Sequence, residues 1–260
     1  DLYDRPYQTD YRNSVWNCGI LPVYRQQLYS VYGEYKNTAR EFFATVNLTH
    51  NREWYNRIYE QRIENGQVQR VSLPLSNHGS GYTVKSTLSK GFYELGLKTS
   101  FLVLLNISKA EQISGGQRLP YQYRLMRLEP KVIWTPNRHW ETSYQTDIRY
   151  GGNKIGERTR LAPLWNVTQQ VQLSYIFSPI EASLSVDHYH NDVNEDQSVN
   201  AVFADFSVSW KSGRWQITTT ATNLFDKRTY AYTQYASLES YTSWVRIRPR
   251  EFLVAIRYQL

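Results

Sequence analysis

Apolar and polar residues alternate along most of this chain, and this alternation restricts its fold more than any other feature. Every second residue from Phe252 to Leu260 is apolar, opposite neighbours that are mostly polar or small. The longest set of apolar residues at alternate positions runs from Tyr93 to Ile107. A period of two places successive side chains on opposite faces of a β-strand, and no segment keeps the period of a helix. The sequence therefore predicts an all-β chain.

Breaks in the alternation divide the chain into about eleven expected strands. The connections between them alternate between short turns and long loops, and Asn65-Gly66 is a strong two-residue turn signal between two of the strands. We expect strands at residues 25–37, 40–64, 67–90, 92–107, 121–134, 139–150, 165–177, 180–190, 198–211, 214–223 and 247–260.

Composition excludes several classes of protein. Hydrophobic residues make up 41% and aromatic residues 15% of the 260 residues, too much of both for a disordered chain. The longest unbroken apolar run is 101–105, which excludes a transmembrane helix but leaves open strands that alternate. The net charge of +7 is spread along the whole chain, and we expect no nucleic-acid partner.

Strand length and loop asymmetry favour an antiparallel transmembrane β-barrel. Many expected strands exceed the ~5–6 residues usual in soluble sheets, whereas a membrane strand needs about 9–11. Short turns at one end and long loops at the other are typical of barrels in the bacterial outer membrane. Aromatic residues near strand ends, such as Trp134, Trp140 and Trp210, suit the headgroup level. The alternative is a soluble β-rich domain, a sandwich or a β-helix, with one buried face.

The last forty residues resemble the C-terminal signature of TonB-dependent outer-membrane receptors. Residues 221–230, Ala-Thr-Asn-Leu-Phe-Asp-Lys-Arg-Thr-Tyr, are similar to the end of the penultimate strand in that family, and Arg248-Pro249-Arg250 is similar to the start of the last strand. Residues 230–243 and 88–92 are most similar to receptors of Bacteroidetes-type bacteria. The terminal Leu260 departs from the usual terminal aromatic residue, although Tyr258 lies two residues earlier on the same side.

The resemblance implies a barrel of about 22 strands with an N-terminal plug. Such a receptor takes up a scarce nutrient, for example a siderophore, cobalamin, glycan or peptide, with energy supplied through TonB. We expect residues 25–260 to form the second half of this barrel and residues 1–24 to be an extracellular loop segment. Because lipid tolerates no open sheet edge, a second polypeptide with the plug and remaining strands is expected to complete it. Outer-membrane lipid, lipopolysaccharide and TonB are the other implied partners.

Candidate ligand contacts lie in the long loop at 224–246, which offers aromatic platforms. The candidates are Tyr230, Tyr232, Tyr235, Tyr241 and Trp244. His188 and His190 share one side of a strand and precede several carboxylates, which makes them a weak candidate for a surface metal site. A solvated strand tip is the other interpretation of these histidines, and we expect no cofactor.

We expect no catalytic residues and no enzymatic activity. Residues 77–80, Asn-His-Gly-Ser, place a histidine beside a serine, so a self-contained barrel hydrolase, or a pore, remains the alternative. No Gly-x-Ser-x-Gly motif supports a nucleophile. Polar residues opposite the apolar sides are expected to face a water-filled or plugged lumen. They include Glu141, Asp147, Arg149, Arg257 and Gln259.

Overall fold

The computed structural model is built almost entirely of β-strands, which confirms the predicted all-β class. It describes residues 6–9, 13–64, 67–156, 159–160, 162–194, 196–235 and 240–259. The described helices are two single 3-10 turns, η1 (Thr38–Arg40) and η2 (Tyr93–Leu95). Neither is long or apolar enough to cross a membrane.

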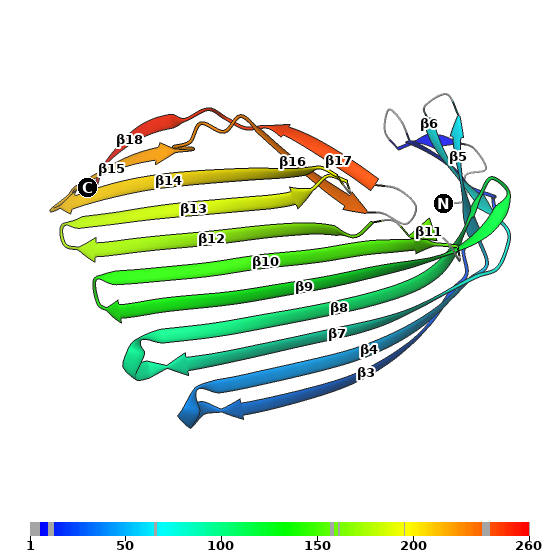
Figure 1. The fold of residues 1–260 in the computed structure, drawn as a ribbon, viewed down its shortest axis with the longest axis horizontal. Coiled ribbons are helices and arrows are strands. Elements are labelled where there is room, and N and C mark those ends of the chain that lie inside the picture. Colours follow the sequence, from blue (N-terminus) through cyan, green and yellow to red (C-terminus); the bar gives the residue numbers. More distant parts are fainter. Residues whose placement is uncertain are drawn as a thin grey trace.

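One sheet of sixteen strands dominates the molecule, and eleven of them follow one another as antiparallel neighbours. Figure 1 shows these strands as a curved, open sheet. They are β3 (Tyr24–Asn37), β4 (Phe42–Tyr55), β7 (Asn77–Phe92), β8 (Leu97–Ser114), β9 (Gln117–Asn137), β10 (Trp140–Ile155), β12 (Leu164–Phe177), β13 (Ile180–Asp192), β14 (Ser198–Ser212), β15 (Trp215–Thr222) and β18 (Glu251–Tyr258). Among the described residues β3 and β18 remain edges and do not pair with each other, so these strands do not close a barrel.

The two ends of this sheet differ. The turns at one end are short: η1, η2, and the pairs between β9 and β10, β12 and β13, and β14 and β15. The C-terminal end of β18 lies at this same end, whereas the N-terminal region and the longer excursions lie at the opposite one (Figure 1). Gly96 and Gly213 supply the left-handed conformation that two of the short turns require, with φ of +60° and +57°.

Two of the expected strands are broken in the structure, and this part of the strand assignment was wrong. The expected strands at 40–64 and 67–90 divide into β4, β5 (Ile58–Glu64), β6 (Gln67–Leu73) and β7. Pro74 cannot donate to a strand ladder, which explains the second break. Asn56 lies at the first break, where its side chain accepts from Val23 N and donates to Leu21 O. The Asn65-Gly66 turn lies outside the described residues, although β5 and β6 pair up to it.

Three further segments expected as loops contain short strands. In the N-terminal region β1 (Tyr7–Gln8) pairs with β2 (Asn13–Trp16), which runs parallel to β6, and β11 (Thr159–Arg160) pairs with β10. Residues 224–246, expected as a long loop, contain a hairpin of β16 (Thr229–Tyr235) and β17 (Ser240–Arg246). The last strand begins at Glu251 instead of 247, since Pro249 interrupts the ladder before it.

The register gives the sheet two chemically distinct faces. Cross-strand partners share a face, so one lateral row contains Val31, Leu48, Val84, Leu105, Met126, Tyr150 and Trp165. The row one residue away contains Tyr32, Asn47, Lys85, Leu104, Arg127, Arg149, Asn166 and Asn191. We call these sides the apolar face and the polar face.

The apolar face has no second layer to cover it in the described part of the chain. Leu48 is 45% exposed, Leu105 39% and Phe252 69%. The buried hydrophobic residues are few, and half of them are alanines: Ile58, Val71, Ile113, Leu164, Ala201, Ala204, Ala221 and Ala231. Soluble domains bury such a face between two layers, so this chain has its apolar side chains arranged on a surface instead of in a core.

Candidate functional site

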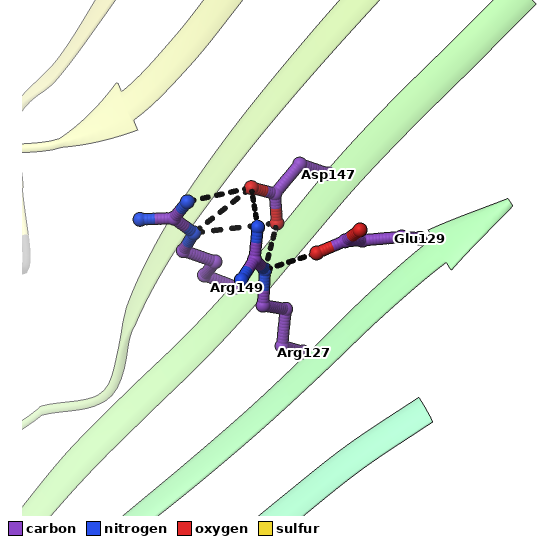
Figure 2. A network of polar contacts seen from close by, with 4 residues as sticks. All are labelled: Arg127, Glu129, Asp147 and Arg149. Atoms are coloured by element: carbon purple, nitrogen blue, oxygen red, sulfur yellow. Dashed lines mark hydrogen bonds and ion pairs between the residues drawn. The ribbon is translucent and has the colours of Figure 1, made fainter. Parts of the chain in front are cut away.

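An ion-pair network lies on the polar face of β9 and β10 (Figure 2). Arg127 donates from Nε and Nη2 to the two carboxylate oxygens of Asp147, each at 3.0 Å. Arg149 donates to the same carboxylate, with Nη2 2.7 Å from Oδ2. Glu129 completes the network through its Oε1, 2.5 Å from Nε of Arg127. Asp147 is therefore held by two guanidinium groups at once.

Local sequence explains this arrangement. Arg127 and Glu129 lie two residues apart on β9, and Asp147 and Arg149 lie two residues apart on β10, so all four face the same side. The pairing of Arg127 with Arg149 brings both arginines within reach of Asp147, while Glu129 pairs with Arg127 of its own strand. Without the two acids the arginines would repel each other across the strands.

The β16–β17 hairpin folds over the polar face beside this network. Asn191 of β13 donates from Nδ2 to Ala231 O at 3.2 Å, and the ring of Tyr189 contacts that of Tyr230 edge to face at 5.2 Å. Ala231 is fully buried and Thr233 is 1% exposed. The hairpin therefore packs on the sheet through β16.

The stretch similar to the receptor signature forms the turn that directs the chain from β15 to this hairpin. Asn223 has φ +50° and donates from Nδ2 to Lys227 O and Arg248 O, both at 2.9 Å. Its Oδ1 accepts from Lys227 N at 3.0 Å. Asp226 accepts from Arg250 N at 2.9 Å. These two side chains bind the segments entering and leaving the hairpin, so their described role is structural.

A cavity of about 480 Å³ lies between the hairpin and the sheet. Buried Asn166 Oδ1 accepts no hydrogen bond from the described residues. Guanidinium, carboxylate, amide, hydroxyl and aromatic groups therefore surround a space large enough for a small polar molecule. Its lining includes Arg127, Asp147, Arg149, Asn166, Thr168, Asn191, Tyr230 and Tyr232.

The predicted aromatic contacts divide into three groups. Tyr230 and Tyr232 line the cavity, with ring centroids 5.9 Å apart. Trp244 lies on β17 and is 68% exposed. The backbones of Tyr235 and Tyr241 belong to β16 and β17, but their side chains lie outside the described residues.

The candidate metal histidines lie on the apolar face at the long-loop end of β13. His190 Nδ1 lies 2.8 Å from Asn200 Oδ1, and its Nε2 is 3.4 Å from Asp192 Oδ1. His188 lies opposite Gln169 and Val202. Within the described ranges no three histidine, cysteine or acidic side chains gather as a metal site would require.

The histidine and serine of the hydrolase alternative also lie on the apolar face. His78 and Ser80 line a second hollow, and no hydrogen bond joins them in the part of the chain that the structure describes. Glu111, the carboxylate in that hollow, pairs with Arg118 at 2.9 Å. These residues therefore lack the linked nucleophile, base and acid of a hydrolase.

Sequence reasoning placed Glu141, Asp147, Arg149 and Arg257 on the polar side, and their register agrees with this. It missed Arg127 and Glu129. The available signal was the pair of opposite charges two residues apart, which occurs on both β9 and β10.

Comparisons with family models, with curated proteins and with solved structures find no match for this chain.

Proposed function

We propose that this chain is the outer-membrane barrel portion of a TonB-dependent receptor that takes up a scarce nutrient. The observation that carries the proposal is the uncovered apolar face of a sheet whose other face is polar. In water this face would cost roughly 25 cal/mol for each Å² exposed, and in a bilayer the lipid chains cover it.

The height of the apolar face supports a membrane location. On β8 the face runs from Leu97 to Ile107 without a charged residue. Ten residue steps of about 3.3 Å span about 33 Å along a strand, or about 25 Å along the membrane normal at the usual barrel tilt of about 40°. Aromatic pairs lie near its short-turn limit: Trp140 with Tyr175 at 4.6 Å and Trp215 with Tyr258 at 4.8 Å. Rings at this depth match the interfacial girdle of outer-membrane barrels.

The two open edges support completion of the barrel by further strands, supplied by a second polypeptide or by another part of the same protein. Within the described residues β3 and β18 leave backbone N–H and C=O groups unpaired along their outer sides, which a bilayer does not tolerate. The proposal does not specify the class of nutrient. The polar cavity between the β16–β17 hairpin and the sheet is a suitable contact site for the nutrient.

The test is the location and composition of the native particle. We expect the protein to fractionate with the outer membrane, to need detergent for extraction, and to migrate faster on gels before boiling than after. A denaturing mass spectrum of the particle should contain a plug and further strands, on this polypeptide or on another. Nutrient accumulation should stop when TonB is depleted. A protein that is soluble without detergent would contradict the membrane assignment, and uptake independent of TonB would contradict the receptor assignment.

A further inference from the structure

A row of positive charges crosses the apolar face near the end of the sheet that carries the longer connections. Arg52 on β4 lies opposite Ser80 on β7, and Ser80 lies opposite Lys109 on β8. Lys109 lies opposite Gln122 on β9, which lies opposite Lys154 on β10. Adjacent strands are about 4.8 Å apart, so the three cations stand about 10 Å from one another with a neutral hydrogen-bonding residue between each pair. We call these five residues the basic row.

The basic row has no acidic partner in the described part of the chain. Arg52, Lys109 and Lys154 take part in no ion pair there. Along the eleven long strands the apolar face has two acids, Glu111 and Asp192. Glu111 pairs with Arg118, and Asp192 lies beside His190 and accepts from Trp165 N at 2.8 Å. The positive charge of the basic row is therefore uncompensated.

A hollow of about 290 Å³ opens within the basic row. Ser80, Lys109, Gln122 and Lys154 line it together with His78 and with Glu111, whose carboxylate pairs with Arg118. Arg124 lies two residues along β9 from Gln122 and is exposed on the same face, so it adds a fourth cation next to the hollow. Ammonium, guanidinium, hydroxyl and amide donors around one recess are the groups that bind phosphate oxygens.

We propose that the basic row binds the phosphate groups of an anionic lipid in the leaflet on the long-loop side. This inference rests on the proposed membrane location, because that location places the lipid chains against Leu48, Leu105 and their neighbours and the headgroups directly above them. An anionic headgroup would neutralise three or four cations that lie at its own depth. Basic residues near an anionic membrane surface contribute about 1 kcal/mol each, which is about fivefold in affinity.

The test compares a triple variant with a matched control in the full receptor. Arg52→Gln, Lys109→Gln and Lys154→Gln remove the charges of the basic row. Lys85→Gln, Lys98→Gln and Lys131→Gln remove the same charge from the polar face of the same sheet. Each purified protein is titrated in detergent with diphosphorylated lipid A, with the same lipid after enzymatic removal of its phosphates, and with inorganic phosphate. Faster gel migration before boiling reports whether each variant is folded.

We expect the triple variant to bind diphosphorylated lipid A about a hundredfold more weakly, and the control to bind it like the parent. The dephosphorylated lipid should bind the parent as weakly as the phosphorylated lipid binds the triple variant. Equal loss in both variants, or equal binding of the two lipids, would overturn the proposal. So would inorganic phosphate that binds as tightly as the lipid, since the site would then serve free anions. These results concern the basic row alone, whereas solubility without detergent would contradict the membrane location.

Discussion

Asp147 is the residue on which the polar-face network depends. Its side chain is 17% exposed, and it bonds both Arg127 and Arg149. We expect Asp147→Ala to lower the free energy of unfolding by about 1–3 kcal/mol, because two guanidinium groups lose their shared partner. Urea unfolding followed by tryptophan fluorescence measures this change.

Glu34→Ala is the matched control for that variant. The Glu34–Lys36 pair, 2.8 Å apart, is more exposed, so its loss should cost about 0–1 kcal/mol. Equal costs for the two substitutions would show that the network adds nothing beyond an ordinary surface ion pair.

Cys18 is the single cysteine of the chain, and its reactivity should depend on pH through Ser72. The two side chains lie 3.4 Å apart, and hydrogen bonding from the Ser72 hydroxyl lowers the pKa of the thiol. A lowered pKa means more thiolate at a given pH, so Ser72→Ala should move the maleimide labelling profile to higher pH and slow labelling at neutral pH. Ser76→Ala, a change at an exposed serine beyond β6, is the control and should leave the profile in place. An unchanged Ser72→Ala profile would refute the role of this hydrogen bond.

The sequence indicated which kind of residue would form the candidate site, but it did not indicate which individual residues would contact the cavity. Tyr230 and Tyr232 were selected for the aromatic character of their loop, and they line the cavity. Trp244 was selected for the same reason and is largely exposed. The difference arises because β16 packs on the sheet, and composition contains no information on which strand of a hairpin does so.

Among the turns, Gly96 has the tightest surroundings. It has φ +60°, and an added Cβ would overlap the Thr135 carbonyl. Gly213 has a similar φ of +57° with nothing within 4 Å of an added Cβ. We expect Gly213→Ala to cost about 1 kcal/mol for the left-handed conformation and Gly96→Ala about 3 kcal/mol or more, because β9 must also shift. Urea unfolding of both variants checks this, and equal costs would mean that the backbone around Gly96 yields freely.

Strands were predictable where their pattern alone determines them. The alternation of β8, β12, β13 and β14 indicates strands with one apolar side, and the structure agrees. The β16–β17 hairpin was missed because its tyrosines pack on the polar face of other strands, a contact between distant segments. The break between β4 and β5 was missed for the same reason, since Asn56 bonds the backbone of residues 21 and 23.

The whole sheet explains properties that no single strand has. The basic row depends on cross-strand register over several hairpins, and the ion-pair network depends on the register of β9 against β10, so neither can be found in the sequence of a single strand. The open edges at β3 and β18 likewise appear only when all pairings are known. The account therefore depends most on the assignment of the two faces to lipid and to water.

The most direct test of that assignment is a spin-label scan of β8 in the complete receptor, reconstituted in vesicles, with Cys18→Ser as background. Labels at Phe101, Val103 and Leu105 should collide with oxygen dissolved in lipid. Labels at Leu102 and Leu104 should collide with a water-soluble nickel chelate, although both are leucines, because they lie on the polar face. Alternation with a period of two would support a lipid-facing apolar face, and the same accessibility at Leu104 and Leu105 would contradict it.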